Sequence, residues 1–227
     1  HEVLMGHGRP AGVGPNPARQ VAHRTGVPHG APAFTINKAC AGGMQALASA
    51  AQSIMLGESE VELAGGTENM SRVPYLIDAA DARWGHKMGH FQFVDAMYRD
   101  GFADPLSGLI MGETAEVLAR QYGITRDQSD QFALESQHKA EAAQKAGRFK
   151  EEIAPVEVPS RKGAIVFADD EYPRHGATLD AMKGLRPAFD KAGTVTAGNA
   201  SMISDGAAAV VVASRVFQEA QGLTPLA

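Results

Sequence analysis

The residues whose types and spacing best suit catalysis lie at positions 37–44, around Cys40, the only cysteine of the chain. A strand-like run ends just before Cys40, and a helix-like run begins just after it. The unpaired N–H groups and the positive dipole end of a helix favour thiolate over thiol at such a position. A lone cysteine is more often a small buried hydrophobic residue, so position alone leaves a structural role open beside a nucleophilic one.

The helix predicted after Cys40 carries an apolar stripe with helical spacing. Its members are Met44, Leu47, Ala48, Ala51, Ile54 and Met55. Nearly all other positions are Ala, Ser, Gly or Gln, so we expect a helix buried in the centre of the fold. Gly42 and Gly43 in its first turn indicate close approach of a ligand or of another backbone, and a tight contact between helix and sheet would require the same glycines.

Local signals predict strands and helices along the rest of the chain. Strands are expected at residues 3–5, 33–37, 61–64 (running into a Gly65-Gly66 turn) and 207–213, the last one buried. Helices are expected from Pro17 (N-cap Asn16) to near Gly26, over 111–122, from Thr125 (capping box with Gln128) to near Gly147, and from Ser214 to near Gly222. The pattern is that of an α/β core with an insertion.

Six motifs spread along the chain resemble those of the thiolase family. They occur in the family's order, at residues 5–20, 37–44, 65–71 (Gly-Gly-Thr-Glu-Asn-Met-Ser), 111–116, 174–178 and 199–209. The resemblance implies a layered α/β fold, an α-β-α core with an inserted loop domain. It divides the chain into a first core part (1–73), the loop domain (74–193) and a returning core segment (194–227).

The resemblance also implies an incomplete thiolase. Members of the family begin with a further strand and helix, and carry a catalytic histidine in a Gly-His-Pro motif and a second cysteine in a C-terminal domain. The 227 residues contain no Gly-His-Pro sequence and no second cysteine. We therefore expect a thiolase truncated at both ends, with little activity of its own.

Thiolases transfer acyl groups between coenzyme A and a carbon acceptor. They condense two acetyl-CoA molecules, or they cleave a 3-oxoacyl-CoA with free coenzyme A. By resemblance Cys40 is the catalytic acyl carrier, and its N–H would donate to the thioester oxyanion. Coenzyme A and acyl-CoA are substrates here, and no further cofactor is implied.

The remaining site residues also follow from the resemblance. Positions that line the coenzyme A channel in the family correspond to Arg174, Phe189, Ala197 and Ser201, and Met111 lies at the acyl pocket. A guanidinium at position 174 suits both stacking and contact with a phosphate. Without the family register, Arg174 would be interpreted as an exposed surface arginine and Phe189 as a core residue.

Composition argues against several other functions. The 21 basic and 26 acidic residues form no long run of one sign, which argues against a nucleic-acid partner. No apolar run approaches the ~20 residues of a membrane span and no signal sequence is visible, so we expect a cytoplasmic protein, with an organelle left open. His86 and His90 are four residues apart but lack a third ligand, so no metal site is predicted.

Other interpretations remain open at this point. A ketosynthase-type condensing enzyme shares the core and the cysteine, although the motif at 65–71 favours the thiolase. A chain of another class would be a non-catalytic coenzyme A-binding module, or a subunit completed by a separate C-terminal chain. The family usually forms dimers or dimers of dimers, so we expect a homo-oligomer.

Overall fold

The computed structural model describes residues 1–227, and it divides into two compact units. The first unit comprises residues 1–106 and 202–227, and the second comprises residues 107–201. None of the helices combines the length and the hydrophobicity that crossing a bilayer requires.

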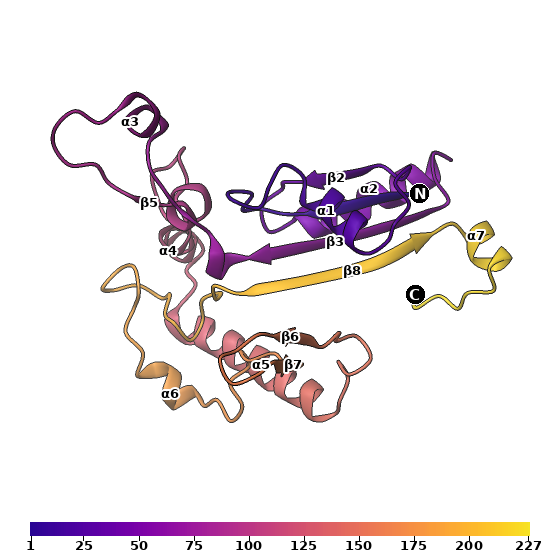
Figure 1. Cartoon of the computed structure of the whole chain (residues 1–227). Helices are drawn as coiled ribbons and strands as arrows, with labels where there is room; N and C mark the ends of the chain where they lie inside the picture. Colours follow the sequence, from indigo (N-terminus) through magenta and orange to yellow (C-terminus); the bar gives the residue numbers. More distant parts are fainter. The chain divides into compact units, whose positions relative to one another are not determined.

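A four-stranded sheet forms the centre of the first unit, in the order β2-β1-β3-β8 (Figure 1). Its strands are β1 (Glu2–Gly6), β2 (Ala33–Ile36), β3 (Val61–Asn69) and β8 (Asp205–Ala213). The first three strands run parallel, and β8 pairs antiparallel with β3 along its whole length. The returning segment of the chain is therefore an edge strand of this sheet.

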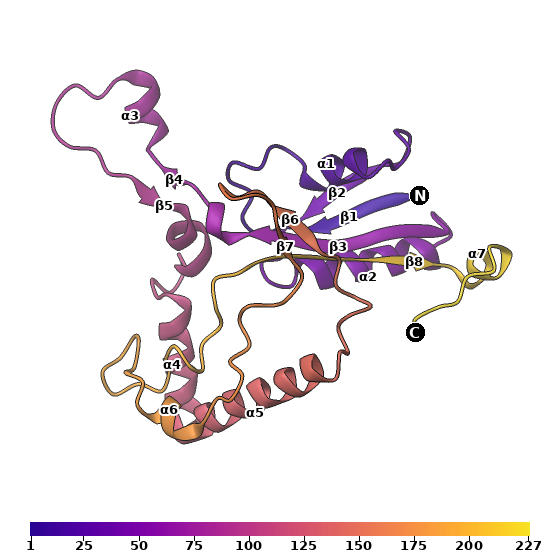
Figure 2. The same cartoon turned by 60° about the horizontal axis from the view of Figure 1, so that its bottom comes forward.

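Helices cover both faces of the sheet (Figure 2). The two helices are α1 (Pro17–Arg24) and α2 (Gly42–Met55). α1 packs on Val3 and Met5 of β1, whereas α2 packs on Leu4 and Ala64. Neighbouring residues of a strand point to opposite faces. The unit is thus an α-β-α sandwich, which confirms the predicted fold class.

Further helices, strands and turns complete the two units. The first unit also contains the 3₁₀ turn η1 (Met70–Arg72), β4 (Tyr75–Leu76), α3 (Ala79–Trp84), β5 (Val94–Asp95), the π-helical turn η2 (Tyr98–Phe102) and α7 (Arg215–Ala220). The second unit contains α4 (Met111–Tyr122), α5 (Arg126–Lys145), β6 (Val156–Val158), β7 (Ile165–Phe167) and α6 (Leu179–Lys183).

The predicted helix starts are confirmed by their side-chain caps. Asn16 Oδ1 accepts a hydrogen bond from Arg19 N at 3.2 Å at the start of α1. At the start of α5, Thr125 Oγ1 accepts from Gln128 N at 3.2 Å, and Gln128 Oε1 accepts from Thr125 N at 2.8 Å. This reciprocal pair is the expected capping box, which satisfies two N–H groups that the helix itself leaves unpaired.

Glycines let α2 lie directly on the end of β1 and on the middle of β3. A Cβ on Gly6 would lie 2.2 Å from the carbonyl carbon of Gly42 and 2.3 Å from Gly43 N. On the other strand, a Cβ on Gly66 would lie 3.3 Å from Gly43 Cα. Of the two explanations for Gly42 and Gly43, the structure supports the tight contact between helix and sheet.

Three details of the predicted core are wrong. α2 buries the small stripe Gly42, Ala46 and Ala50, while Met44 and Met55 of the predicted apolar face are 76% and 85% exposed. The reason is that small residues are needed where the helix lies so close to the strands. The strand at 207–213 exists, but it is mostly exposed: it lies at the sheet edge, and Val212 is its residue that packs against the core cluster of α2.

The third detail is the expected Gly65-Gly66 turn. β3 continues through both glycines to Asn69, because β8 pairs with them opposite Ala209 and Ala208. A Cβ on Gly65 would lie 2.3 Å from Ala208 O, so the glycine serves the strand pairing rather than a turn.

The compact units are divided after residues 106 and 201. The predicted domains have boundaries after residues 73 and 193 instead, and these boundaries stay a prediction. Residues 74–106 belong with the sheet, where Arg9 packs against Gly101 and its guanidinium lies 5.9 Å from the centre of the Phe102 ring. Residues 194–201 belong with the second unit, since they are bound to α4.

Glu116 of α4 makes that connection. Its buried carboxylate accepts hydrogen bonds from Thr194 N at 2.9 and 3.0 Å, from Val195 N at 2.8 Å and from Thr194 Oγ1 at 3.1 Å. Burial alone would raise the pKa of Glu116, but these hydrogen bonds outweigh it and hold the pKa below its usual value of 4.5.

The close contact at Gly6 predicts a large effect of a single methyl group. Gly6→Ala forces two backbone segments apart, so we expect the free energy of unfolding to fall by about 3 kcal/mol, as overpacking of a rigid site does. Urea unfolding followed by circular dichroism measures the change. Gly30→Ala is the matched control, because nothing lies within 4 Å of the added Cβ. Equal stability of the two variants would contradict the contact.

Glu116→Gln should destabilise the second unit by about 1–3 kcal/mol at pH 7, because an amide nitrogen then faces the N–H groups of residues 194 and 195. A carboxyl whose folded pKa is lowered stabilises fully above its unfolded pKa and loses this effect as pH falls through the folded value. The difference between wild type and variant should therefore shrink below about pH 4.5, the usual carboxyl range. Urea unfolding at several pH values measures it, with exposed Glu151→Gln as control. A difference independent of pH would refute this role of the carboxylate.

Candidate active site

Cys40 lies in an exposed turn between β2 and α2, as predicted. The turn is held by its own backbone and one side chain. Asn37 Oδ1 accepts a hydrogen bond from Ala39 N at 3.1 Å, and Ala39 O accepts from Gly42 N at 3.0 Å. The thiol is therefore presented to solvent from a fixed loop rather than packed in the core.

The residue before Cys40 has a strained backbone. Ala39 is the only residue other than glycine with a positive φ, at 46°. This left-handed conformation costs an L-residue about 1–2 kcal/mol, and such strain is typical of functional turns. Gly8 packs against the turn, since a Cβ built on it would lie 3.6 Å from Ala39 Cα.

The start of α2 is left without a side-chain cap. Its N-cap residue is Ala41, which has no hydrogen-bonding side chain. No protein side chain therefore competes with a ligand for the N–H groups of the first helical turn. The positive end of the helix dipole lies at the same place, next to Cys40, and it favours an anion such as a thiolate or a thioester oxyanion.

Cys40 belongs to the first unit, and the other predicted site residues belong to the second. Met111 is the first residue of α4 and is 53% exposed. The Phe189 ring packs on the next residue, Gly112, so closely that a Cβ there would lie 2.0 Å from Phe189 Cε2. The structure thus brings Met111 and Phe189 to one place.

The three remaining residues are exposed on other segments of the second unit. The backbone N–H of Arg174 donates to Gln137 Oε1 at 2.7 Å, while its guanidinium makes no hydrogen bond or ion pair within the chain. Ala197 and Ser201 lie near the end of the unit, in the segment that leads to β8. All three side chains are accessible to a ligand.

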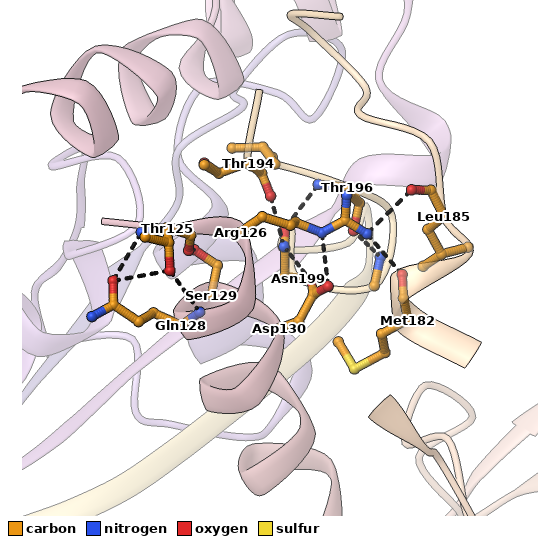
Figure 3. A network of polar contacts seen from close by, with 12 residues as sticks. Thr125, Arg126, Gln128, Ser129, Asp130, Met182, Leu185, Thr194, Thr196 and Asn199 are labelled. Carbon is orange, nitrogen blue, oxygen red and sulfur yellow. Dashed lines mark hydrogen bonds and ion pairs between the residues drawn. The ribbon is translucent and has the colours of Figure 1, made fainter. Parts of the chain in front are cut away.

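A buried polar network holds the segments that carry these residues (Figure 3). Arg126 Nε of α5 donates to Asp130 Oδ2 at 2.7 Å, and Asp130 is fully buried. Arg126 Nη2 also donates to Met182 O at 2.7 Å and to Leu185 O at 3.1 Å. Asn199 Nδ2 donates to the second oxygen of Asp130 at 2.8 Å. One ion pair therefore joins α5, α6 and the loop around residue 199.

Asn199 also fixes the loop around Ala197. Its Oδ1 accepts from Thr196 N at 2.8 Å, and its Nδ2 donates to Thr194 O at 2.9 Å. Sequence analysis missed this network. The signal that could have found it is the spacing of Arg126 and Asp130, four residues apart on the predicted helix.

No cluster of three or more His, Cys, Asp or Glu side chains could hold a metal ion. Each unit thus carries candidate residues of its own: the first presents a thiol at a helix start, and the second presents exposed apolar, small and cationic residues at the start of α4 and on its loops.

Comparisons with known proteins agree on one family. The model of the thiolase N-terminal domain matches residues 1–216. Acetyl-CoA acetyltransferase of Cupriavidus necator is 55% identical over 227 residues, which are 100% of this chain and 57% of the relative. The acetyl-CoA acetyltransferase of Escherichia coli is 50% identical over 226 residues, again 100% of this chain and 57% of the relative.

Solved structures give the same result. Acetyl-CoA acetyltransferase of Bacillus anthracis superposes with a TM-score of 0.92 at 42% identity, covering 99% of this chain and 56% of that one. Human mitochondrial 3-ketoacyl-CoA thiolase gives a TM-score of 0.92 at 40% identity, covering 99% and 57%. The chain therefore spans only about half the length of the relatives that it matches.

The position of Cys40 predicts a reactive thiol. We expect iodoacetamide to modify Cys40 about fivefold faster at pH 7 in the folded protein than in urea, because the folded turn presents the exposed thiol at the positive end of α2. Mass spectrometry of quenched samples measures the rate at the peptide that contains Cys40. Modification no faster than in the denatured chain would show that the turn does not activate the thiol.

Proposed function

The chain belongs to the thiolase family, and we propose that it is the acyl-carrying part of an acyl-CoA C-acyltransferase. The observation that carries the proposal is the exposed Cys40 in a strained turn at the uncapped start of α2. The acetyl-CoA acetyltransferases that it resembles supply the reaction class. The motif at 65–71, which spans the end of β3 and the start of η1, favours this proposal over a ketosynthase-type enzyme.

In the proposed first step, the Cys40 thiolate attacks the carbonyl carbon of an acyl-CoA. The carbonyl oxygen becomes an oxyanion, and the N–H of Cys40 donates to it; the N–H groups of Ala41 and Gly42 are already used by the carbonyls of Lys38 and Ala39. The C–S bond to coenzyme A then breaks, coenzyme A leaves as a thiolate that takes up a proton, and an acyl-cysteine remains.

In the second step the acyl group leaves Cys40. In condensation its acceptor is the α-carbon of acetyl-CoA, which must lose a proton; in thiolysis the acceptor is the sulfur of coenzyme A. None of the side chains around Cys40 described above is placed as a base for this proton. We therefore propose that these 227 residues alone acylate slowly and do not turn over.

Coenzyme A would be bound by the exposed residues of the second unit. We assign Arg174 to the adenine and phosphate end, because its guanidinium is free to stack and to pair with a phosphate. Phe189, Ala197 and Ser201 would line the pantetheine channel, and Met111 beside Phe189 would contact the acyl group. The loop hydrogen bonds of Asn199 would keep this channel open.

We also propose a reducing compartment and an oligomeric assembly as the biological setting. A single exposed cysteine without a disulfide suits a reducing compartment such as the cytoplasm. The exposed apolar side chains on α2 and β8 suit a protein that assembles with further copies or segments. The partners are accordingly acyl-CoA, coenzyme A and a second copy, in keeping with the family.

Acetyl-CoA is the substrate that tests the proposal. Incubation with it should give an acetyl adduct on the peptide that contains Cys40, detected by mass spectrometry, and Cys40→Ala should remove it with unchanged circular dichroism. The 227-residue chain alone should release no more than one coenzyme A per chain. Multiple turnover by this chain alone would contradict the missing base, and no adduct would contradict the acyl-cysteine.

The coenzyme A contact is tested separately by Arg174→Ala. We expect KM for acetyl-CoA in the whole protein to rise about tenfold with kcat nearly unchanged, as expected when a charged contact made equally in ground and transition states is lost. Arg161→Ala is the matched control, an exposed arginine in the same unit. Equal KM values for the two variants would remove Arg174 from the site.

A further inference from the structure

His7 is a buried imidazole with an acceptor at each ring nitrogen. It follows β1 and is 5% exposed. Its Nδ1 lies 2.7 Å from Thr67 O, and its Nε2 lies 3.0 Å from Arg9 O. Carbonyl oxygens only accept, and a neutral imidazole has one N–H. Only the doubly protonated ring satisfies both contacts, so the geometry calls for an imidazolium at this place.

Glu68 supplies the opposite charge. Its Oε1 lies 3.5 Å from His7 Nδ1 and is buried without a hydrogen bond. Its Oε2 accepts from Gly8 N at 2.8 Å. A buried carboxylate oxygen without a partner is costly, and a neighbouring cation removes most of that cost. His7 and Glu68 thus each supply the charge that the other needs.

This pair adjoins the turn of Cys40. His7 N donates to Ile36 O at 2.9 Å, at the last residue of β2. Gly8, which Glu68 holds, is the residue that packs under the strained backbone of Ala39. The pair therefore holds Ile36, the last residue of β2 before the turn, and Gly8, which packs against Ala39 in the turn.

We propose that His7, as an imidazolium paired with Glu68, is a positioning residue for Cys40. It keeps the turn in the conformation that presents the thiol and its N–H at the start of α2. The inference rests on the proposed acyl transfer at Cys40. The charged pair acts through the backbone of the turn and contacts neither the substrate nor the thiol.

Arg9 and Lys38 are the charged residues of the segments next to His7 and Cys40. The guanidinium of Arg9 lies over the Phe102 ring with its Nε buried and without a hydrogen bond, and Lys38 Nζ donates to Gln45 Oε1 at 2.6 Å. Glu68 is the carboxylate within 4 Å of the ring, and Cys40 is the further titratable group of the turn. Without the Glu68 charge, the carbonyl oxygens of Thr67 and Arg9 are the groups left to hold a proton on each ring nitrogen.

Ring ¹⁵N NMR of the whole protein tests the charge directly. At pH 7.5 both ring nitrogens of His7 should carry a proton, and the assignment comes from the signals lost in His7→Gln or shifted in Glu68→Gln. In Glu68→Gln one ring nitrogen should be bare at this pH. A neutral His7 ring in the wild-type protein overturns the proposal, whichever variants fold.

Alkylation of Cys40 by iodoacetamide tests the positioning. His7→Gln should lower the rate about five- to tenfold at pH 7, and the exposed His90→Gln should leave it unchanged. In Glu68→Gln the ratio of wild-type to variant rate should grow from near one at pH 6 to about five or more at pH 8, as His7 loses its proton. A purely structural loss gives a constant ratio, and that result, or an unaffected folded His7→Gln, overturns the proposal.

The outcome is separable from that of the proposed function, because alkylation and NMR need no acyl-CoA. Wild-type protein that forms the acetyl adduct but has a neutral His7 refutes only this inference. A charged His7 and a responsive Cys40 without any acetyl adduct refute only the acyl transfer.

Discussion

Contact between glycine backbones is the constraint on which the candidate site depends. Gly6 at the end of β1 and Gly66 in the middle of β3 leave no side chain between the sheet and Gly42 and Gly43 of α2. The helix start is thereby placed at backbone distance from the sheet, and Cys40, two residues earlier, is placed with it. Any Cβ at Gly6 would lie within the helix backbone, so the position of the thiol tolerates almost no variation.

That close contact dictates the residues around it. A helix so near the sheet can bury only small side chains, and so α2 turns Ala46 and Ala50 inward and leaves its methionines outside. The chain must also turn sharply between β2 and α2, which places Ala39 in the left-handed region. A strained turn needs external support, and the neighbouring strand ends provide it through Gly8 and the His7–Glu68 pair.

Local signals predicted most elements, because caps and periodicity act over a few residues: Asn16, Thr125 and Ser214 each begin a helix as expected. They failed where burial depends on distant segments. The apolar run at 207–213 indicates a core strand, yet the position of β8 at the sheet edge is set by its pairing with β3. The turn around Cys40 was predictable from its motif, and the Arg126–Asp130 pair could have been found from its spacing of four residues on a helix. The His7–Glu68 pair and the hydrogen bond between Asn199 and Asp130 join residues far apart in sequence, and no local pattern specifies them.

In the second unit, hydrogen bonds to buried carboxylates fix the loops, whereas close backbone packing does so in the first unit. Its buried residues are as often polar as apolar: Glu116, Asp130 and Thr196 stand against Ala119, Leu134 and Met182. Dispersion contacts in an apolar core are non-directional, so by themselves they fix the direction of a neighbouring segment less strictly than hydrogen bonds do. Hydrogen bonds to a buried carboxylate are directional, so Glu116 and Asp130 set the path of residues 182–199 as well as its stability. In the proposed coenzyme A site, the loops that carry Phe189 and Ala197 would need such a fixed path, because both side chains would have to meet one ligand.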